Sequence, residues 1–370
     1  MSDRVHVHIG LPKTATSYLQ TILWSNRALL RDRGVVVPGA ERRDHLWASR
    51  TVREDPHQAK APERHRTAWR RIVAELERSP GNGLISHEFF AAASGEQAQA
   101  MVAALSAAEV HLVVTAREPL GLFTASWQES LKNGDTTPMA EYARHESSNP
   151  NAIWNWRTLD LRLVLERWAQ AVPPERTHVL VLDPEAPRED VWNRFAGILG
   201  TDPDGVDLTG SFPNTSMGVV EAETLRRVNV SLRGFNKAFD KGVYIRTFLA
   251  DDRLVPREGE RFWPRPDQIE ECRRRGEDAV AYLQSAAYHL VGSPDHLRVP
   301  DDLEQRRLPD SVSDAEVAGV AVDLVATMLG DVRRLRQERE RRPGTRGGRA
   351  SGSPGRIRRR LQRLRNGLSR

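Results

Sequence analysis

The sequence has few of the features that mark secreted, metal-cluster and membrane-spanning proteins. Cys272 is the only cysteine in 370 residues, which excludes an intramolecular disulfide and a cysteine-based zinc cluster and is typical of a reducing cytoplasm. No apolar run approaches the roughly 20 residues that a membrane-spanning helix needs. The N-terminus enters a strand pattern almost at once, so we expect no secretory signal. The sequence also lacks a His-Glu-x-x-His motif and a carboxylate-rich calcium loop, so we expect no metal.

Positive charge is abundant but concentrated at the C-terminal end. The formal net charge is +5 and the pI is about 9.6. Residues 331–370 contain fifteen arginines and three acidic residues, a balance of +12, so the first 330 residues sum to −7. The folded body is therefore expected to be mildly acidic, and the high pI gives no reason to predict a specific nucleic-acid partner.

Short apolar segments alternate with amphipathic helical patterns and predict an α/β fold. Such alternation is typical of a three-layer sandwich, in which a central parallel sheet is covered by helices on both faces. Ligands of these sheets bind beyond the carboxyl ends of the strands, so the loops after Ile9, His87 and Ala116 should converge on one cleft. The expected strands are 5–9, 34–38, 83–87, 110–116 and 178–183, and the expected helices are 16–31, 66–76, 95–107, 120–132, 157–170 and 190–198.

The C-terminal third is expected to hold less regular structure. Residues 1–330 are predicted to form one domain, with the cofactor-binding elements within 4–130 and a helical, irregular substrate or cap region over about 208–330. Residues 331–370 are predicted to be a basic, partly disordered tail. Its apolar residues at 357, 361, 364 and 368 fall at helical spacing among arginines. This pattern suits an anionic membrane surface, and a solvated disordered end is the alternative.

Residues 4–20, RVHVHIGLPKTATSYLQ, carry the strongest functional signal. A strand, a short loop, Lys13-Thr14 and a helix form a typical phosphate cradle, in which backbone N–H groups and the helix dipole face an anion. Lys13 adds a point charge, and Thr14, Thr16 and Ser17 add hydroxyl donors. Only two residues separate Gly10 from Lys13, so the loop differs from the G-x-x-x-x-G-K-[ST] loop of ATP-binding proteins. An ordinary turn with a surface lysine is the alternative.

A second segment, TAREPLGLFTASW at 115–127, places Arg117 at the end of a predicted strand and Pro119 at the start of a helix. Arginine binds phosphate through two parallel hydrogen bonds. The segment therefore predicts a second phosphate contact. The alternative is an ion pair between Arg117 and the neighbouring Glu118.

A third segment, SHEFF at 86–90, supplies candidates for a general base. His87 and Glu88 follow the third strand, and either could take a proton from an acceptor. We favour Glu88, because His87 continues the strand pattern; a capping role or an arginine pair is the alternative. His45 is a further candidate, with a surface histidine as the alternative.

These segments resemble the bacterial sulfotransferases that use 3′-phosphoadenosine 5′-phosphosulfate (PAPS), over roughly residues 4–230. The 5′-phosphosulfate loop of that family is commonly P-K-[TS]-G-T-[ST], which Pro12, Lys13, Thr14, Thr16 and Ser17 match. Ala15 stands where the family often has glycine, and a methyl group there is tolerable if the residue is already helical. Arg117-Glu118-Pro119 resembles the family's R-[DN]-P, but Ala125 replaces the serine eight residues later, which leaves Ser126 as the nearest hydroxyl candidate.

The resemblance implies a P-loop NTPase-like fold and a set of residue roles. Residues 12–17 would hold the 5′-phosphosulfate, with Lys13 neutralising the leaving oxygen, while Arg117 and Ser126 would hold the 3′-phosphate. Glu88, His87 or His45 would activate the acceptor. We therefore expect a sulfotransferase acting on a hydroxyl or amine of a carbohydrate, lipid or small metabolite, without a metal. It would be cytoplasmic, with peripheral attachment at the inner face of the membrane left open. An ATP-dependent small-molecule kinase and a non-catalytic nucleotide-binding or membrane-associated adaptor are the alternatives.

Overall fold

The computed structural model describes residues 2–210 and 216–340. The chain divides into two compact units, Met1–Ser311 and Val312–Arg370. The second unit contains one described helix, α14 (Asp314–Glu340). The domain boundary expected at residue 330 falls inside this helix, and the expected amphipathic segment at 357–368 lies outside the described residues. No helix in the described ranges is long and apolar enough to cross a membrane.

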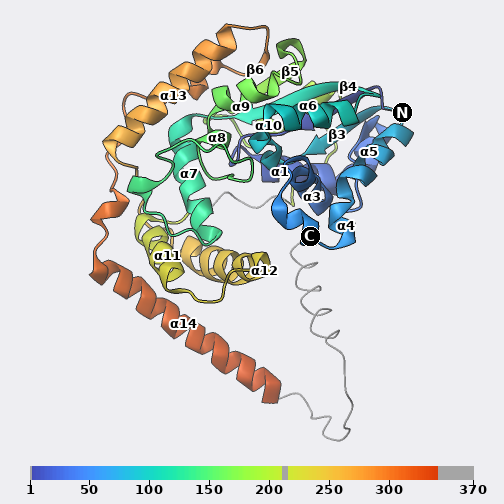
Figure 1. Ribbon diagram of the computed structural model, residues 1–370. Helices are drawn as coiled ribbons and strands as arrows, with labels where there is room; N and C mark the ends of the chain where they lie inside the picture. The colour runs from blue at the N-terminus through green and yellow to red at the C-terminus, as the bar shows by residue number, and fades with distance from the viewer. Residues whose placement is uncertain (1, 211–215, 341–370) are drawn as a thin grey trace, which may run out of the picture. The chain divides into compact units, whose positions relative to one another are not determined.

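A sheet forms the centre of the first unit, with helices around it (Figure 1). It has six strands in the order β2-β3-β1-β4-β5-β6. Every pairing between neighbouring strands is parallel. The prediction of an α/β fold with a central parallel sheet is therefore confirmed. The strands are β1 (Arg4–His8), β2 (Val35–Val36), β3 (Asn82–Ser86), β4 (Glu109–Ala116), β5 (Thr177–Val181) and β6 (His289–Val291).

Helices cover both faces of the sheet, as expected of a three-layer sandwich (Figure 1). The helices that precede residue 200 are α1 (Thr16–Ser25), α2 (Arg27–Asp32), α3 (Arg43–Val52), α4 (Glu63–Arg66), α5 (Ala68–Arg78), α6 (Gly95–Ala104), α7 (Pro119–Lys132), α8 (Trp156–Leu159), α9 (Leu161–Trp168) and α10 (Asp190–Leu199). Later come α11 (Val219–Ser231), α12 (Ala238–Asp240), a π-helix (Lys241–Leu254) and α13 (Pro266–Gln284).

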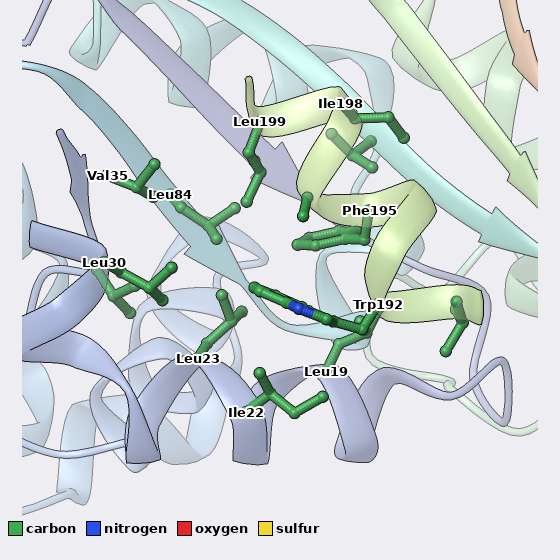
Figure 2. Close-up of a cluster of buried hydrophobic side chains, with 14 of the residues drawn as sticks. Leu19, Ile22, Leu23, Leu30, Val35, Leu84, Trp192, Phe195, Ile198 and Leu199 are labelled. Atoms are coloured by element: carbon green, nitrogen blue, oxygen red, sulfur yellow. The ribbon is translucent and has the colours of Figure 1, made fainter. Parts of the chain in front are cut away.

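One buried cluster joins α1 and α10 to a face of the sheet (Figure 2). Trp192 and Phe195 of α10 are fully buried against Leu19 and Leu23 of α1. Removing a side chain of this size from water contributes about 1.5–3 kcal/mol. Because α1 begins directly after the loop that follows β1, this packing also fixes where that loop lies.

Several elements differ from the sequence prediction. The helix expected over 16–31 is interrupted at Asn26, whose side-chain amide donates to the carbonyl oxygens of Ile22 and Asp207. The helix expected over 157–170 is interrupted at Asp160, whose side chain caps α9. The strand β6 and the π-helix lie in the region that was expected to be irregular. A strand of three residues has too little alternation to be recognised from sequence.

Candidate functional site

The loop between β1 and α1 has an unusual backbone. Gly10, Lys13 and Ala15 have φ angles of 43°, 69° and 60°, whereas Thr14 between the last two does not have a positive φ. Alternation of this kind forms a nest, in which successive backbone N–H groups point into one concavity and can bind an anion. Gly10 cannot carry a side chain here, because a Cβ atom would lie 2.4 Å from Cγ2 of Thr16.

Thr14 holds this loop against β4. Its hydroxyl is buried, donates to the carbonyl oxygen of Leu11 at 2.6 Å and lies 2.7 Å from the hydroxyl oxygen of Thr115. The hydroxyl is therefore engaged within the protein and does not line the cleft, and a contact with the 5′-phosphosulfate stays a prediction. Pro12 is buried in the same loop and does not line the cleft either.

The backbone of Ala15 is in the left-handed region and not in the helical region. The sequence led us to expect that a methyl group is tolerated at this position if the residue is helical, and that condition is not met. Ala15 precedes the first residue of α1 and provides no side-chain cap. A residue with a Cβ atom in this conformation costs roughly 1–2 kcal/mol relative to the ordinary helical region. The loop therefore stores strain at the position where the resembling family often has glycine.

A cleft of about 520 Å³ opens at the carboxyl ends of the strands, as the parallel sheet predicts. This volume lies within the usual range for small-molecule sites. Six basic and three acidic side chains line it, so the balance favours an anionic ligand. The lining residues are Lys13, Ala15, Thr16, Ser17, Tyr18, Glu88, Arg117, Glu118, Gly121, Thr124, Ala125, Gln128, Glu129, Lys132, Trp154, Ser216, Met217, Arg246, Arg261, Phe262, Trp263 and Arg306.

Arg117 lies in the cleft at the start of α7, and it is paired. Its guanidinium donates to Glu118 at 3.0 Å, and the Glu118 carboxylate also accepts from the backbone N–H of Gly121. Gly121 leaves space for this arrangement, since a Cβ atom there would lie 2.3 Å from Nη2 of Arg117. The sequence left a position in the cleft and an ion pair with Glu118 as alternatives for Arg117. In the structure Arg117 has both.

Ser126 faces the interior and not the cleft. Its side chain is fully buried, and its hydroxyl oxygen lies 2.6 Å from that of Tyr142. Thr124 and Ala125 line the cleft instead. The assignment of Ser126 to the 3′-phosphate is therefore wrong, because one further residue along a helix turns the side chain by about 100°.

Of the three candidate bases, only Glu88 lines the cleft. It accepts a hydrogen bond from the side chain of Gln20 at 3.1 Å. Burial would raise the pKa of Glu88, but His87, Gln20 and Arg42 together hold it below its usual range. His87 is buried, and its Nδ1 accepts from the backbone N–H of Phe89, so it caps the turn that follows β3.

His45 is a structural residue rather than a surface histidine or a base. It is buried, its Nδ1 accepts from the backbone N–H of Ser86 at 3.1 Å, and its Nε2 donates to the carbonyl oxygen of Pro38 at 2.8 Å. Burial lowers the pKa of His45 to about 4. The side chain thus connects the end of β3 with the loop after β2 and does not reach the cleft.

Sequence reasoning missed an ion cluster at the base of the cleft. Nζ of Lys13 lies 3.2 Å from Oε2 of Glu129, and Arg246 of the π-helix pairs with the other carboxylate oxygen. Burial alone would raise the pKa of Glu129, but Arg246, Lys13 and Lys132 lower it to about 2. The helical spacing of Ala125, Glu129 and Lys132 on one face of α7 was the available signal.

Ala15→Gly should raise the free energy of unfolding by about 1 kcal/mol, because glycine adopts a left-handed conformation without the Cβ penalty. Urea denaturation would measure the change. Ala100→Gly in the exposed part of α6 is the control, and it should lower stability by about 0.5–1 kcal/mol. A loss of stability in both variants would show that residue 15 is unstrained.

The free energy of unfolding should fall as the pH is lowered from about 6.5 towards 4. The unfolded chain binds a proton at His45 near pH 6.5, whereas the folded chain resists it down to about pH 4. The slope is about 1.4 kcal/mol per pH unit for each such histidine. His45→Gln should show a shallower slope in denaturation series at several pH values. His145→Gln, at an exposed side chain, is the control, and equal slopes for all three proteins would refute the assignment.

Comparison with models of protein families gives no match, and comparisons with curated proteins and with solved structures give none at the significance required. No relative therefore supplies a residue role or an activity for this chain. The functional conclusion depends on the cleft and on the sequence motifs that line it.

Proposed function

We propose that the chain is a sulfotransferase that moves a sulfuryl group from PAPS to a hydroxyl or amine acceptor. The observation that supports this most directly is that Lys13, Ser17 and Arg117 line one cleft, although the two motifs lie about a hundred residues apart. PAPS carries two anionic groups, a 5′-phosphosulfate and a 3′-phosphate. The nest before α1 suits the first group, and Arg117 suits the second.

The transfer requires an acceptor atom to attack sulfur while the bond from sulfur to the bridging phosphate oxygen breaks. Adenosine 3′,5′-bisphosphate leaves, and negative charge grows on its 5′-phosphate. Lys13 and the backbone N–H groups of the nest stabilise that charge, and preorganised groups of this kind supply much of the rate in related group transfers. Glu88 is ionised at neutral pH and takes the acceptor proton as the new bond forms.

Glu129 sets the starting state for this reaction. In the structure its carboxylate forms ion pairs with two of the cationic side chains that line the cleft, Lys13 and Arg246. An incoming phosphosulfate competes with that carboxylate for Lys13. We therefore assign Glu129 the role of an internal competitor, whose carboxylate pairs with the Lys13 ammonium until the donor displaces it.

The kinase alternative is less consistent with the cleft. Magnesium in a kinase bridges phosphate oxygens and is held by carboxylates. All three carboxylates that line this cleft already have polar partners: Glu88 with Gln20, Glu118 with Arg117, and Glu129 with Lys13 and Arg246. We therefore propose that the reaction proceeds without a metal, and that activity persists in excess chelator.

The acceptor is proposed to be a carbohydrate, a lipid or a small metabolite, and the protein is proposed to work in the cytoplasm. The arginine-rich end of the chain would provide peripheral attachment to anionic lipid at the inner face of the membrane. A non-catalytic adaptor would use the same attachment. Incubation with labelled PAPS and members of each acceptor class separates an enzyme from an adaptor, because only the enzyme transfers label.

Arg117→Ala should weaken the binding of adenosine 3′,5′-bisphosphate by roughly 10- to 100-fold and leave adenosine 5′-phosphate nearly unchanged. A charge-assisted contact to the 3′-phosphate contributes about 1.5–3 kcal/mol. Isothermal titration with both nucleotides measures the difference, and Arg31→Ala, on an exposed side chain outside the cleft, is the control. Equal weakening of the two nucleotides would remove Arg117 from the 3′-phosphate site, and tighter binding of ATP with magnesium would favour the kinase.

Lys13→Ala should reduce sulfuryl transfer on the order of 100-fold or more, because it removes a preorganised charge at the leaving oxygen. Lys60→Ala, at an exposed lysine outside the cleft, should retain wild-type turnover. Glu129→Gln should bind adenosine 3′,5′-bisphosphate more tightly than wild type, since it removes the competing carboxylate. Near-normal turnover in Lys13→Ala, or weaker nucleotide binding in Glu129→Gln, would contradict these roles.

A further inference from the structure

Four histidines lie side by side on one face of the sheet, well away from the cleft. His6 of β1 pairs in register with His111 of β4, and His178 of β5 pairs in register with His289 of β6. His111, His178 and His289 lie in the amino-terminal halves of their strands, whereas the cleft lies beyond the carboxyl ends of the strands. None of the four lines the cleft.

Three of these imidazoles converge on one point. Nδ1 of His111 lies 2.9 Å from Nε2 of His178. The ring of His6 completes the group, with its centre 5.5 Å from that of His111 and 6.2 Å from that of His178. One nitrogen from each ring lies within 4.8 Å of the other two. Three nitrogens bound to a tetrahedral Zn²⁺ at 2.0–2.1 Å lie about 3.4 Å apart, so the His111 and His178 nitrogens would separate slightly and the His6 nitrogen would move inward by up to about 1 Å.

His6 is the residue that a purely structural explanation leaves unexplained. Its side chain is 1% exposed, and neither ring nitrogen makes a hydrogen bond of ordinary geometry, although a backbone group of Gly83 lies close enough to raise the pKa of the ring slightly. Burying a polar group without a partner is unfavourable, and unpartnered buried groups are uncommon in native proteins. A replacement by leucine would avoid that cost, so the imidazole needs another reason to be there.

The surrounding contacts suit metal ligands. Nε2 of His111 lies 2.5 Å from a carboxylate oxygen of Glu109, and Nδ1 of His178 lies 2.7 Å from Nδ1 of His289. Metal-bound histidines usually donate their second N–H to a carboxylate or another acceptor in this way, which fixes the tautomer and orients the ring. Each of the two rings therefore has one nitrogen held by a neighbour and one nitrogen turned toward the cluster.

A chain of hydrogen bonds from His289 through His178 and His111 to Glu109 would satisfy the same contacts without a metal. In that arrangement Nε2 of His178 donates to Nδ1 of His111. It leaves both nitrogens of His6 without a partner, however, although His6 faces the same point. A bound cation would give a partner to one nitrogen of each of the three rings, whereas the hydrogen-bonded chain gives partners to His111 and His178 alone.

We propose that His6, His111 and His178 bind one Zn²⁺ ion through one ring nitrogen each. Three neutral imidazoles are typical ligands of Zn²⁺ and of neighbouring transition metals, whereas Mg²⁺ and Ca²⁺ require oxygen ligands. Zn²⁺ with three protein ligands keeps a fourth position for water. The exposed side chains of Glu109 on β4 and His289 on β6 show that solvent reaches both neighbours of the site. The site is independent of the proposed sulfuryl transfer.

The test uses the full chain without a polyhistidine tag, stripped of metal with chelator and then dialysed. Zn²⁺ titration by calorimetry should give one ion per chain with micromolar affinity or tighter. Co²⁺ should give the intense visible absorption of a tetrahedral site. Zn²⁺ should also raise the melting temperature, because the three histidines lie together only in the folded chain and the ion therefore binds that state more tightly.

Three variants identify the ligands among the eleven histidines of the chain. His178→Gln should lower Zn²⁺ affinity by more than about 100-fold, and Glu109→Gln, at a side chain that is half exposed, should lower it by about 10- to 100-fold. His57→Gln, at a distant exposed position, should bind as wild type does. The proposal is overturned if wild type takes up no Zn²⁺ at one equivalent, or if His178→Gln and His57→Gln bind it equally well.

Discussion

The burial of α1 against α10 and the sheet is the constraint on which the cleft depends. Leu19, Trp192 and Phe195 fix the helix axis, and the loop of residues 10–15 must then connect the end of β1 to a helix that cannot move. Within this short connection Lys13 and Ala15 have left-handed conformations. The same conformations give the loop the alternating backbone that is typical of a nest, so the proposed anion site depends on core packing and on loop length together.

Strands and helices with strong periodicity were predictable from the sequence. The strand expected at 110–116 is Glu109–Ala116, and the helix expected at 190–198 is Asp190–Leu199. Lys13, Arg117 and Glu88 could be assigned to one cleft, because parallel strands end at the same edge of a sheet. The direction of a single side chain was not predictable in the same way. Ser126 and Thr14 carry suitable hydroxyls, but tertiary packing turns them towards Tyr142 and Thr115.

Contacts between segments far apart in the sequence could not be predicted from local sequence patterns either. Arg246 reaches Glu129 across 117 positions, from a π-helix in a region without clear periodicity. The histidine cluster depends on the register of three strands, which no local motif records. The expectation of no metal was based on local spacing motifs alone, and such motifs do not describe ligands contributed singly by separate strands.

The pairing of Lys13 with Glu129 has a consequence for selectivity. An anion that enters the cleft replaces the Glu129 carboxylate as the partner of Lys13. Its binding free energy therefore contains the difference between two ionic contacts and not the full energy of one. Inorganic phosphate or a chloride ion offers little beyond what the carboxylate already provides. A ligand with two separated anionic groups reaches the nest and Arg117 at once, and only such a ligand gains enough to displace both internal carboxylates. Under the proposed function, the acidic side chains would act as a threshold that favours a ligand with two separated anionic groups over the common cellular anions.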